Sequence, residues 1–328
     1  MHLDPFALHH PATVDEALAT VARLGPAACD YLAGGTDLLP NYKMHLNARP
    51  NLVALGRIPE LCARTPDRLG AMVRLGELDA DPAVGRRRPA LAEAVGEVAT
   101  PLVRASGTVG GNLLLETRCF FFNQTLPWRE SLGYCLKAAG DRCHVVPQTE
   151  RCYATHSGDL APALLALDAS VEIAGPAGRR TVPVGALYDA AGDGIRRLTL
   201  APGEILIAVD LPPPDPLDRS GYRKLRVRPS FDFPELGVAA RLRADGGRVA
   251  ALRLAVGGVE TYPRAFDDLT AGVVGGSLSD DRLRALADSV QKAVRPVHNT
   301  FLPPDYRKRM VGVYVRRLLE HLRAGAAG

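Results

Sequence analysis

A cysteine-rich segment constrains this chain more than any other feature. Four of its six cysteines, Cys119, Cys135, Cys143 and Cys152, fall within 34 residues and are spaced C-x15-C-x7-C-x8-C. Four thiolates suit zinc or an iron–sulfur cluster, because both bind soft sulfur ligands in tetrahedral sets. The spacing contains no CxxC pair, so it matches neither a zinc ribbon nor a ferredoxin. From spacing alone, an iron–sulfur cluster, zinc and unligated buried thiols all stay open.

The composition is that of an ordinary soluble protein. With 328 residues, 47% hydrophobic and 23% charged, the chain is long enough for two or three domains with separate cores. A net charge of +4 without a clustered basic face gives no case for nucleic-acid binding. We expect no membrane span and no signal peptide. Six cysteines without a secretory signal indicate a reducing compartment, by default the cytoplasm.

The order of periodic segments predicts three parts. A capped helix and two short strands open the chain as a small α/β unit, and alternation over Ala71–Leu78 predicts a strand in the second part. Three consecutive prolines at 212–214 mark a linker. Antiparallel strands and two helices follow. The predicted ranges are 1–56, 57–214 with an insert at 117–156, and 215–328.

Two glycine motifs suggest an anion site. AGGTD at 33–37 and TVGGN at 108–112 each place two glycines beside a hydroxyl side chain. Glycines allow positive φ and let several backbone N–H groups face one phosphate. We expect Asp37 to cap the following turn rather than to touch an anion. Neither motif is GxGxxG or a Walker A loop, so two tight structural turns are the alternative.

The motifs also carry a resemblance to a known family. Together with SGDLAPALLALDA at 157–169, they resemble the FAD-binding subunit of molybdenum hydroxylases, the xanthine and carbon monoxide dehydrogenase group. The stretches 222–242 and 305–319 are similar to that family's C-terminal domain. The resemblance covers nearly the whole chain. It implies an α+β, vanillyl-alcohol-oxidase-like (PCMH-type) FAD-binding fold of two α/β subdomains plus a C-terminal antiparallel sheet with helices.

The resemblance implies FAD as cofactor and a set of residues that bind it. Both glycine motifs would surround the pyrophosphate, Asp159 would lie near the ribityl or adenosine part, and Leu206 near the isoalloxazine ring. Lys224 would stabilise the anionic reduced flavin at its polar edge; without the family it is a solvated strand lysine. The implied set is Ala33, Gly34, Gly35, Thr36, Asp37, Thr108, Gly110, Gly111, Asn112, Asp159, Leu206 and Lys224.

The cysteine segment interrupts the family pattern. The GGN motif usually leads almost directly into the helix that begins near Asp159, but here about 40 residues intervene. This insert resembles the one in the β subunit of 4-hydroxybenzoyl-CoA reductase, where four cysteines of an extra loop bind a 4Fe–4S cluster. The resemblance implies that Cys119, Cys135, Cys143 and Cys152 are the ligands. Zinc has no redox chemistry, so beside a flavin it would only staple the loop.

The implied role is electron transfer, with no catalytic residue in this chain. Electrons from ferredoxin would pass through the 4Fe–4S cluster and FAD to 2Fe–2S clusters on a small subunit and a molybdenum cofactor on a large one. The complex, a dimer of heterotrimers, would remove a phenolic hydroxyl from an aromatic CoA thioester. The alternative is the FAD subunit of an ordinary hydroxylase that passes electrons to NAD or a quinone. A non-catalytic assembly module is the third possibility, against which the intact glycines argue.

Several residues around the cysteines have competing interpretations. Lys137 could offset cluster charge, form part of a docking face, or be a solvated loop charge. His156 is expected to tune hydrogen bonding or to be solvated rather than to replace a thiolate. Trp128 is expected to pack the loop onto the domain. Cys29 and Cys62 are expected to be ordinary small apolar residues.

Overall fold

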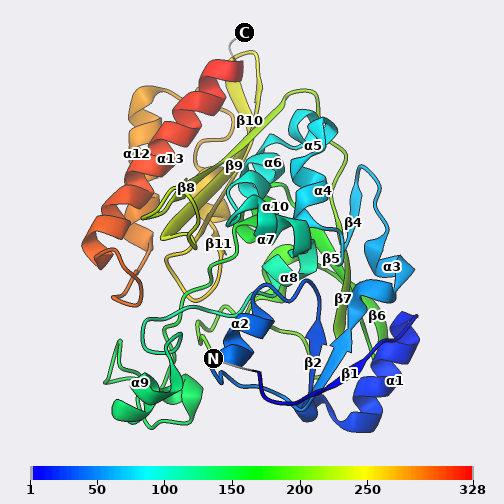
Figure 1. Cartoon of the computed structure of the whole chain (residues 1–328). Helices are drawn as coiled ribbons and strands as arrows, with labels where there is room; N and C mark the ends of the chain where they lie inside the picture. Colours follow the sequence, from blue (N-terminus) through cyan, green and yellow to red (C-terminus); the bar gives the residue numbers. More distant parts are fainter. Residues whose placement is uncertain (1–2, 327–328) are drawn as a thin grey trace.

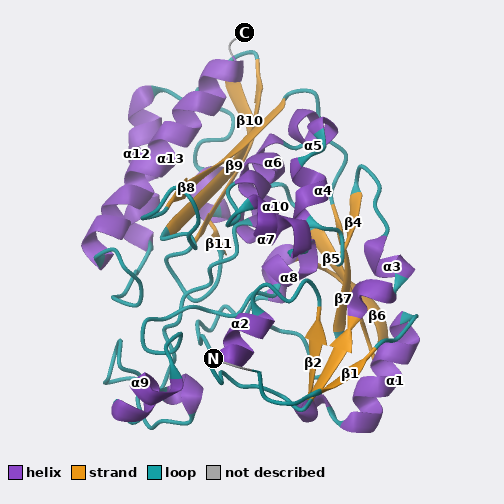
Figure 2. Cartoon of the chain, viewed as in Figure 1, coloured by secondary structure: helices purple, strands orange, loops and turns teal. Residues whose placement is uncertain are grey.

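The computed structural model describes residues 3–326, which form three β-sheets with helices between and around them (Figures 1 and 2). The first sheet has the order β1-β3-β2 and is parallel. The second, β4-β7-β5-β6, and the third, β11-β10-β9-β8, are antiparallel. Separate sheets with helices packed on them make this an α+β protein, as predicted.

The first sheet belongs to a small α/β unit. Its strands are β1 (Ala7–His9), β2 (Cys29–Leu32) and β3 (Asn51–Ala54). Helix α1 (Val14–Leu24) starts where the sequence indicates, because the Thr13 hydroxyl accepts the Glu16 N–H at 3.1 Å. Its buried face joins a core that includes residues of β7, so this unit packs on the second sheet. The short helix α2 (Leu38–Lys43) follows β2.

The second sheet is built from strands far apart in the sequence. They are β4 (Arg68–Gly70), β5 (Ser170–Gly175), β6 (Gly178–Pro183) and β7 (Ile205–Asp210). The strand predicted over 71–78 is wrong. The chain turns after Gly70 and enters helix α4 (Leu75–Asp79), in which Leu75 and Leu78 lie one turn apart and are both buried. Residues three apart share one face of a helix, whereas the alternation of a strand would place them on opposite faces.

Short helices fill the space between the second and third sheets (Figure 1). Helices α6 and α10 touch strands of the third sheet, and α10 also belongs to the core of the second. The helices of this layer are α5 (Pro82–Arg87), α6 (Pro89–Gly96), α7 (Pro101–Ser106), α8 (Val109–Leu113) and α10 (Leu160–Ala166). Helix α3 (Pro59–Cys62) instead joins the core of the first unit.

The third sheet carries two long helices on its outer face (Figure 1). Its strands are β8 (Asp218–Leu225), β9 (Leu236–Asp245), β10 (Arg248–Gly257) and the two-residue β11 (Arg264–Ala265). The helices are α11 (Asp267–Ala271), α12 (Asp280–Ala293) and α13 (Pro304–Ala326). The three sheets lie within the three predicted ranges, although the boundaries themselves stay a prediction. Between residues 3 and 326, every helix is too short or too polar to cross a lipid bilayer.

The insert at 117–156 forms a lobe of its own beside α2 (Figure 1). An isolated antiparallel bridge closes its base, where Arg118 and Thr155 exchange two backbone hydrogen bonds of 2.8 Å. Its helix α9 (Leu126–Ser131) contains the buried Arg129, which donates to the carbonyl oxygens of Met44 at 2.7 Å and His45 at 3.1 Å. The insert is therefore docked on the segment that follows α2.

Candidate functional site

A cavity of about 970 Å³ lies among the first subdomain, the second subdomain and the insert. All the predicted cofactor-binding residues except Lys224 line this cavity. Cys119 lines it as well, whereas the other three cysteines of the insert do not. The volume is at the upper end of the range typical of ligand pockets, about 300–1,000 Å³. A large cofactor therefore fits the space to which the sequence motifs point.

The first glycine motif is a tight turn, as predicted. Gly35 has φ +71°, a conformation that L side chains rarely adopt. Gly34 needs no positive φ, but a Cβ there would lie 1.9 Å from the Ser106 carbonyl oxygen. The predicted cap by Asp37 is wrong, because its side chain makes no cap bond to α2. Asp37 instead forms an ion pair with Arg118 at the base of the insert.

The second motif differs from the prediction. Residues 109–113 form helix α8, in which neither Gly110 nor Gly111 has positive φ. The Thr108 hydroxyl caps this helix by accepting the Gly111 N–H at 3.1 Å. Gly110 donates to the Ala71 carbonyl oxygen at 2.8 Å, and a Cβ on Gly110 would lie 2.8 Å from Ala71 Cβ. Close packing therefore explains Gly110, and the motif faces the cavity as a capped helix start.

Asp159 links the cavity wall to the third sheet. Its carboxylate accepts the Tyr222 hydroxyl at 2.7 Å and pairs with the Lys224 ammonium at 3.1 Å. Lys224 also donates to the Glu97 carbonyl oxygen at 2.8 Å, and its side chain is 0% exposed. The interpretation of Lys224 as a solvated lysine is therefore wrong. Burial raises the pKa of Asp159, and the Lys224 ammonium counteracts that effect.

The cavity has an apolar wall and an aromatic rim. Leu206 on β7 is buried and lines the wall together with Leu198 and Leu200. The rim carries Phe231, Phe233 and Phe301, all of them exposed. An apolar wall beside polar backbone groups is the usual composition of a cofactor pocket. Leu206 therefore lies where an apolar ring could pack.

The charged residues of the wall that the sequence analysis missed include Glu116, Arg118 and Arg197. Arg118 lies with its guanidinium 4.3 Å from the centre of the Phe233 ring, and burial lowers its pKa to about 10. Glu116 and Arg197 form an ion pair of 2.9 Å. Burial alone would raise the pKa of Glu116, but Arg197 and Lys137 lower it to about 2. In the sequence, only its position next to Cys119 pointed to Arg118 as a site residue. No sequence feature pointed to Arg197.

The four cysteines of the insert are unpaired and buried. Cys119, Cys135 and Cys152 share one apolar cluster with Phe122, and the charge of Cys143 reaches Cys119. Within residues 3–326, however, no three His, Cys, Asp or Glu side chains lie close enough to hold one metal ion. Burial raises the pKa of Cys119 to about 12 and of Cys152 to about 11. Both are therefore neutral thiols until a metal displaces their protons.

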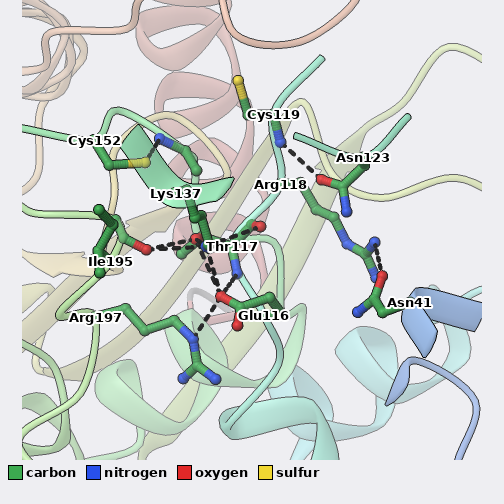
Figure 3. A network of polar contacts seen from close by, with 12 residues as sticks. Asn41, Glu116, Thr117, Arg118, Cys119, Asn123, Lys137, Cys152, Ile195 and Arg197 are labelled. Atoms are coloured by element: carbon green, nitrogen blue, oxygen red, sulfur yellow. Dashed lines mark hydrogen bonds and ion pairs between the residues drawn. The ribbon is translucent and has the colours of Figure 1, made fainter. Parts of the chain in front are cut away.

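Figure 3 shows polar contacts near two of the four cysteines, Cys119 and Cys152. The Ala154 N–H donates to Cys152 Sγ at 3.4 Å, and the Cys119 N–H donates to the Asn123 side chain at 3.0 Å. Lys137 is buried with a side chain 4% exposed, so its interpretation as a solvated charge is wrong. Backbone donors and a cation near thiolates are the groups that stabilise a negatively charged metal–sulfur centre.

Other predictions for this region have mixed outcomes. His156 is buried, not solvated, and its ring packs edge-on against Tyr188 with centroids 5.0 Å apart. Trp128 is 38% exposed and its nearest aromatic neighbour is Phe121 of the insert itself, so Arg129 rather than Trp128 docks the insert. Outside the insert, Cys29 is buried as expected, whereas Cys62 is exposed.

Comparison with known proteins agrees with this geometry. Residues 4–214 match the FAD binding domain in molybdopterin dehydrogenase, and residues 220–322 match the CO dehydrogenase flavoprotein C-terminal domain. The chain is 32% identical over 308 residues to the aldehyde oxidoreductase FAD-binding subunit PaoB of Escherichia coli, covering 90% of this chain and 93% of that one. It is 28% identical to the carbon monoxide dehydrogenase medium chain of Hydrogenophaga pseudoflava, covering 96% of each.

The same likeness holds in three dimensions. The solved carbon monoxide dehydrogenase of Hydrogenophaga pseudoflava contains a chain that superposes with a TM-score of 0.80 at 27% identity, covering 99% of both chains. The predicted PCMH-type FAD-binding fold with its C-terminal α+β domain is thus confirmed. The chain belongs to the family of FAD-binding subunits of molybdenum hydroxylases, and it is an FAD-binding oxidoreductase subunit.

Proposed function

We propose that this chain transfers electrons between FAD, bound in the 970 Å³ cavity, and a 4Fe–4S cluster held by Cys119, Cys135, Cys143 and Cys152. One observation carries the proposal. Cys119 lines the same cavity as both glycine motifs, and its sulfur lies in the buried cluster with Cys135 and Cys152. The two centres would therefore share a wall. Electron transfer needs this kind of proximity, and no acid–base pair is required.

The cavity supports FAD by its shape and its donors. The AGGTD turn at 33–37 would hold the pyrophosphate, and Leu206 would pack against the ring system. Asp159 would contact the ribityl or adenosine part. Bound FAD supplies a carrier that accepts one or two electrons. Lys224, already paired with Asp159, would act on the flavin through that carboxylate.

The cysteine site supports a cluster better than a single zinc ion. Zinc would need its ligands close around one centre, and no three candidate ligands among residues 3–326 meet that condition. In a 4Fe–4S cluster each thiolate binds a different iron, so the sulfur atoms stand farther apart. The four thiols are buried and unpaired, and the other three lie within electrostatic range of Cys119. Four such thiols in one insert supply the ligand number that a cubane cluster would need.

We further propose that the chain works with a large molybdenum-cofactor subunit and a small 2Fe–2S subunit, as a dimer of heterotrimers in the cytoplasm. Support comes from relatives named as a medium chain or an FAD-binding subunit, terms that imply other subunits. By resemblance of the insert, the complex would be a 4-hydroxybenzoyl-CoA reductase that takes electrons from ferredoxin for reductive dehydroxylation.

A second candidate is favoured by the named relatives. They are an aldehyde oxidoreductase, a carbon monoxide dehydrogenase and a xanthine dehydrogenase. The chain would then serve an oxidising hydroxylase and pass electrons outward to NAD or a quinone. The fold and the flavin site are the same in both candidates, which differ in the direction of electron flow and in the insert's contents: in this candidate the insert holds zinc or nothing.

Anaerobic mixing of the purified complex with candidate redox partners distinguishes the two functions. The reductase predicts that reduced ferredoxin bleaches the flavin absorbance rapidly and that NAD leaves reduced flavin unchanged. Rapid reoxidation by NAD or a quinone with no response to ferredoxin would favour the hydroxylase. A complex without flavin absorbance would contradict both.

A further inference from the structure

Three charged side chains form a partly buried chain between the cysteine site and the cavity (Figure 3). Glu116 Oε1 accepts from Lys137 Nζ at 2.6 Å and from Arg197 Nε at 2.9 Å. Glu116 and Arg197 line the cavity, whereas Lys137 belongs to the insert, two residues after Cys135. One carboxylate thus joins a cation on the insert to a cation on the cavity wall.

Lys137 is buried next to the cysteine site and is surrounded by hydrogen-bond acceptors. Its Nζ donates to Glu116, to the Thr117 hydroxyl and to the Gly194 carbonyl oxygen at 3.0 Å, three acceptors that match three N–H bonds. Gly194 also packs on Cys152, because a Cβ there would lie 3.1 Å from the sulfur. The cation and the thiol therefore share one buried environment.

Arg197 presents an unused donor at the cavity. Its Nε is bonded to Glu116, but its second nitrogen NH1 is buried and has no hydrogen-bond partner among the described residues. A buried N–H without an acceptor is energetically unfavourable. Arg197 also lines the cavity, so its positive charge lies beside any ligand bound there.

We propose that Glu116 divides its negative charge between two cations that tune two different redox centres, Lys137 for the cluster and Arg197 for the flavin. This rests on the proposed function. A nearby positive charge favours the reduced, more negative state of a centre and raises its potential, and burial keeps such charges poorly screened. Lys137 and Arg197 each raise one potential, and Glu116 lowers both. Lys137, Glu116 and Arg197, here called the triad, thus set the difference in potential that drives electrons between the cluster and the flavin.

Redox titrations of three variants of the holo complex test this. Lys137→Met should lower the cluster potential and leave the flavin potential nearly unchanged. Arg197→Met should do the reverse, and Glu116→Gln should raise both. We expect a change of at least tenfold in the ratio of reduced to oxidised centre at fixed potential, about 59 mV for one electron. The cluster is followed by electron paramagnetic resonance and the flavin by visible absorbance.

Iron and flavin contents are measured first, and Arg142→Met is the control because Arg142 is an exposed arginine of the same insert. Wild-type complex without the cluster would overturn the proposed function and the Lys137 role, while the flavin titration would still judge Arg197. A loaded complex whose variants all titrate like wild type would overturn the triad and leave the function standing. If the Lys137→Met complex does not load iron, the Glu116→Gln complex provides the test. Cluster and flavin potentials that are unchanged or lower in that variant would contradict the proposal.

Discussion

At the cavity, Asn112 and Asp159 each hold another element in place besides lining the wall. Asn112 Oδ1 accepts the Leu160 N–H at 3.0 Å and so caps α10. Asp159 binds Tyr222 and Lys224 of β8. The sequence motif identifies these residues as belonging to the site. It does not reveal their contacts, because the partners of Asp159 are more than 60 positions away in the chain.

Gly35 offers the most direct test of the first motif. Valine at φ +71° is strained by about 1–3 kcal/mol, and its Cβ would also meet Leu39. We expect Gly35→Val to weaken FAD binding about tenfold or more, measured as flavin per chain after gel filtration. Gly35→Asn is the matched control, because asparagine tolerates the left-handed conformation and should retain more flavin. Full flavin in the valine variant would remove this turn from the site.

His156 makes stability depend on pH. Burial, helped by Arg197, lowers the pKa of His156 from 6.5 to about 3. Between these values the unfolded chain binds a proton that the native ring does not, so the free energy of unfolding falls as pH decreases. Above pH 6.5 the effect vanishes. From pH 7 to 5, wild type should lose about 2 kcal/mol more than His156→Phe.

Denaturant unfolding at several pH values measures this difference. The same substitution at the exposed His298 is the control and should keep the wild-type pH dependence. Parallel curves for wild type and His156→Phe would mean that the ring is protonated in the native protein.

Among the elements, α8 and α4 show where prediction from sequence stops. Two adjacent glycines disfavour a helix, so TVGGN reads as a turn, yet Thr108 caps it and Gly110 packs against Ala71. Tertiary contact overrides local preference in α8, whereas in α4 the positions of the buried leucines already match a helix. By contrast, α1 is correctly predicted because Thr13 and its buried apolar face are local signals. The three-sheet order, formed by strands far apart in sequence, has no such signal.

The proposed cluster should be separable from the flavin site by substitution of one of its cysteines. We expect Cys135→Ser to remove the four irons of the cluster while FAD stays bound, because Cys135 does not line the cavity. Iron, acid-labile sulfide and flavin per complex are measured after anaerobic purification. Cys62→Ser is the control, since that exposed thiol lies outside the insert. Loss of iron and flavin together would make the insert a structural part of the flavin domain.

At the scale of the whole molecule, the C-terminal domain supports the insert. The Asn299 carbonyl oxygen accepts the Phe120 N–H at 3.0 Å, and its side chain donates to the Tyr153 carbonyl oxygen at 2.5 Å. Arg307 on α13 in turn donates to Asn299 Oδ1 at 3.1 Å. The two contacts between Asn299 and the insert join residues at least 146 positions apart, beyond any local pattern.

Arg307 is the centre of this support. Its side chain is 0% exposed and pairs with Glu235 at 3.4 Å. Removing one partner of a buried ion pair costs about 3–5 kcal/mol, so Arg307→Met should lower the free energy of unfolding by that amount. Arg316→Met, on the same helix but exposed and paired with Glu320, should cost less than about 1 kcal/mol. Equal effects of the two substitutions in urea unfolding would contradict this assignment.

The central claim is that the insert holds a 4Fe–4S cluster beside the flavin. Mössbauer spectroscopy of the iron-57-enriched, anaerobically purified complex tests it directly, compared with the Cys135→Ser complex. We predict that the wild-type spectrum contains the signal of a cubane cluster in addition to the 2Fe–2S signals of the proposed small subunit. The variant should lack the cubane signal. Identical spectra that contain only 2Fe–2S signals would contradict it.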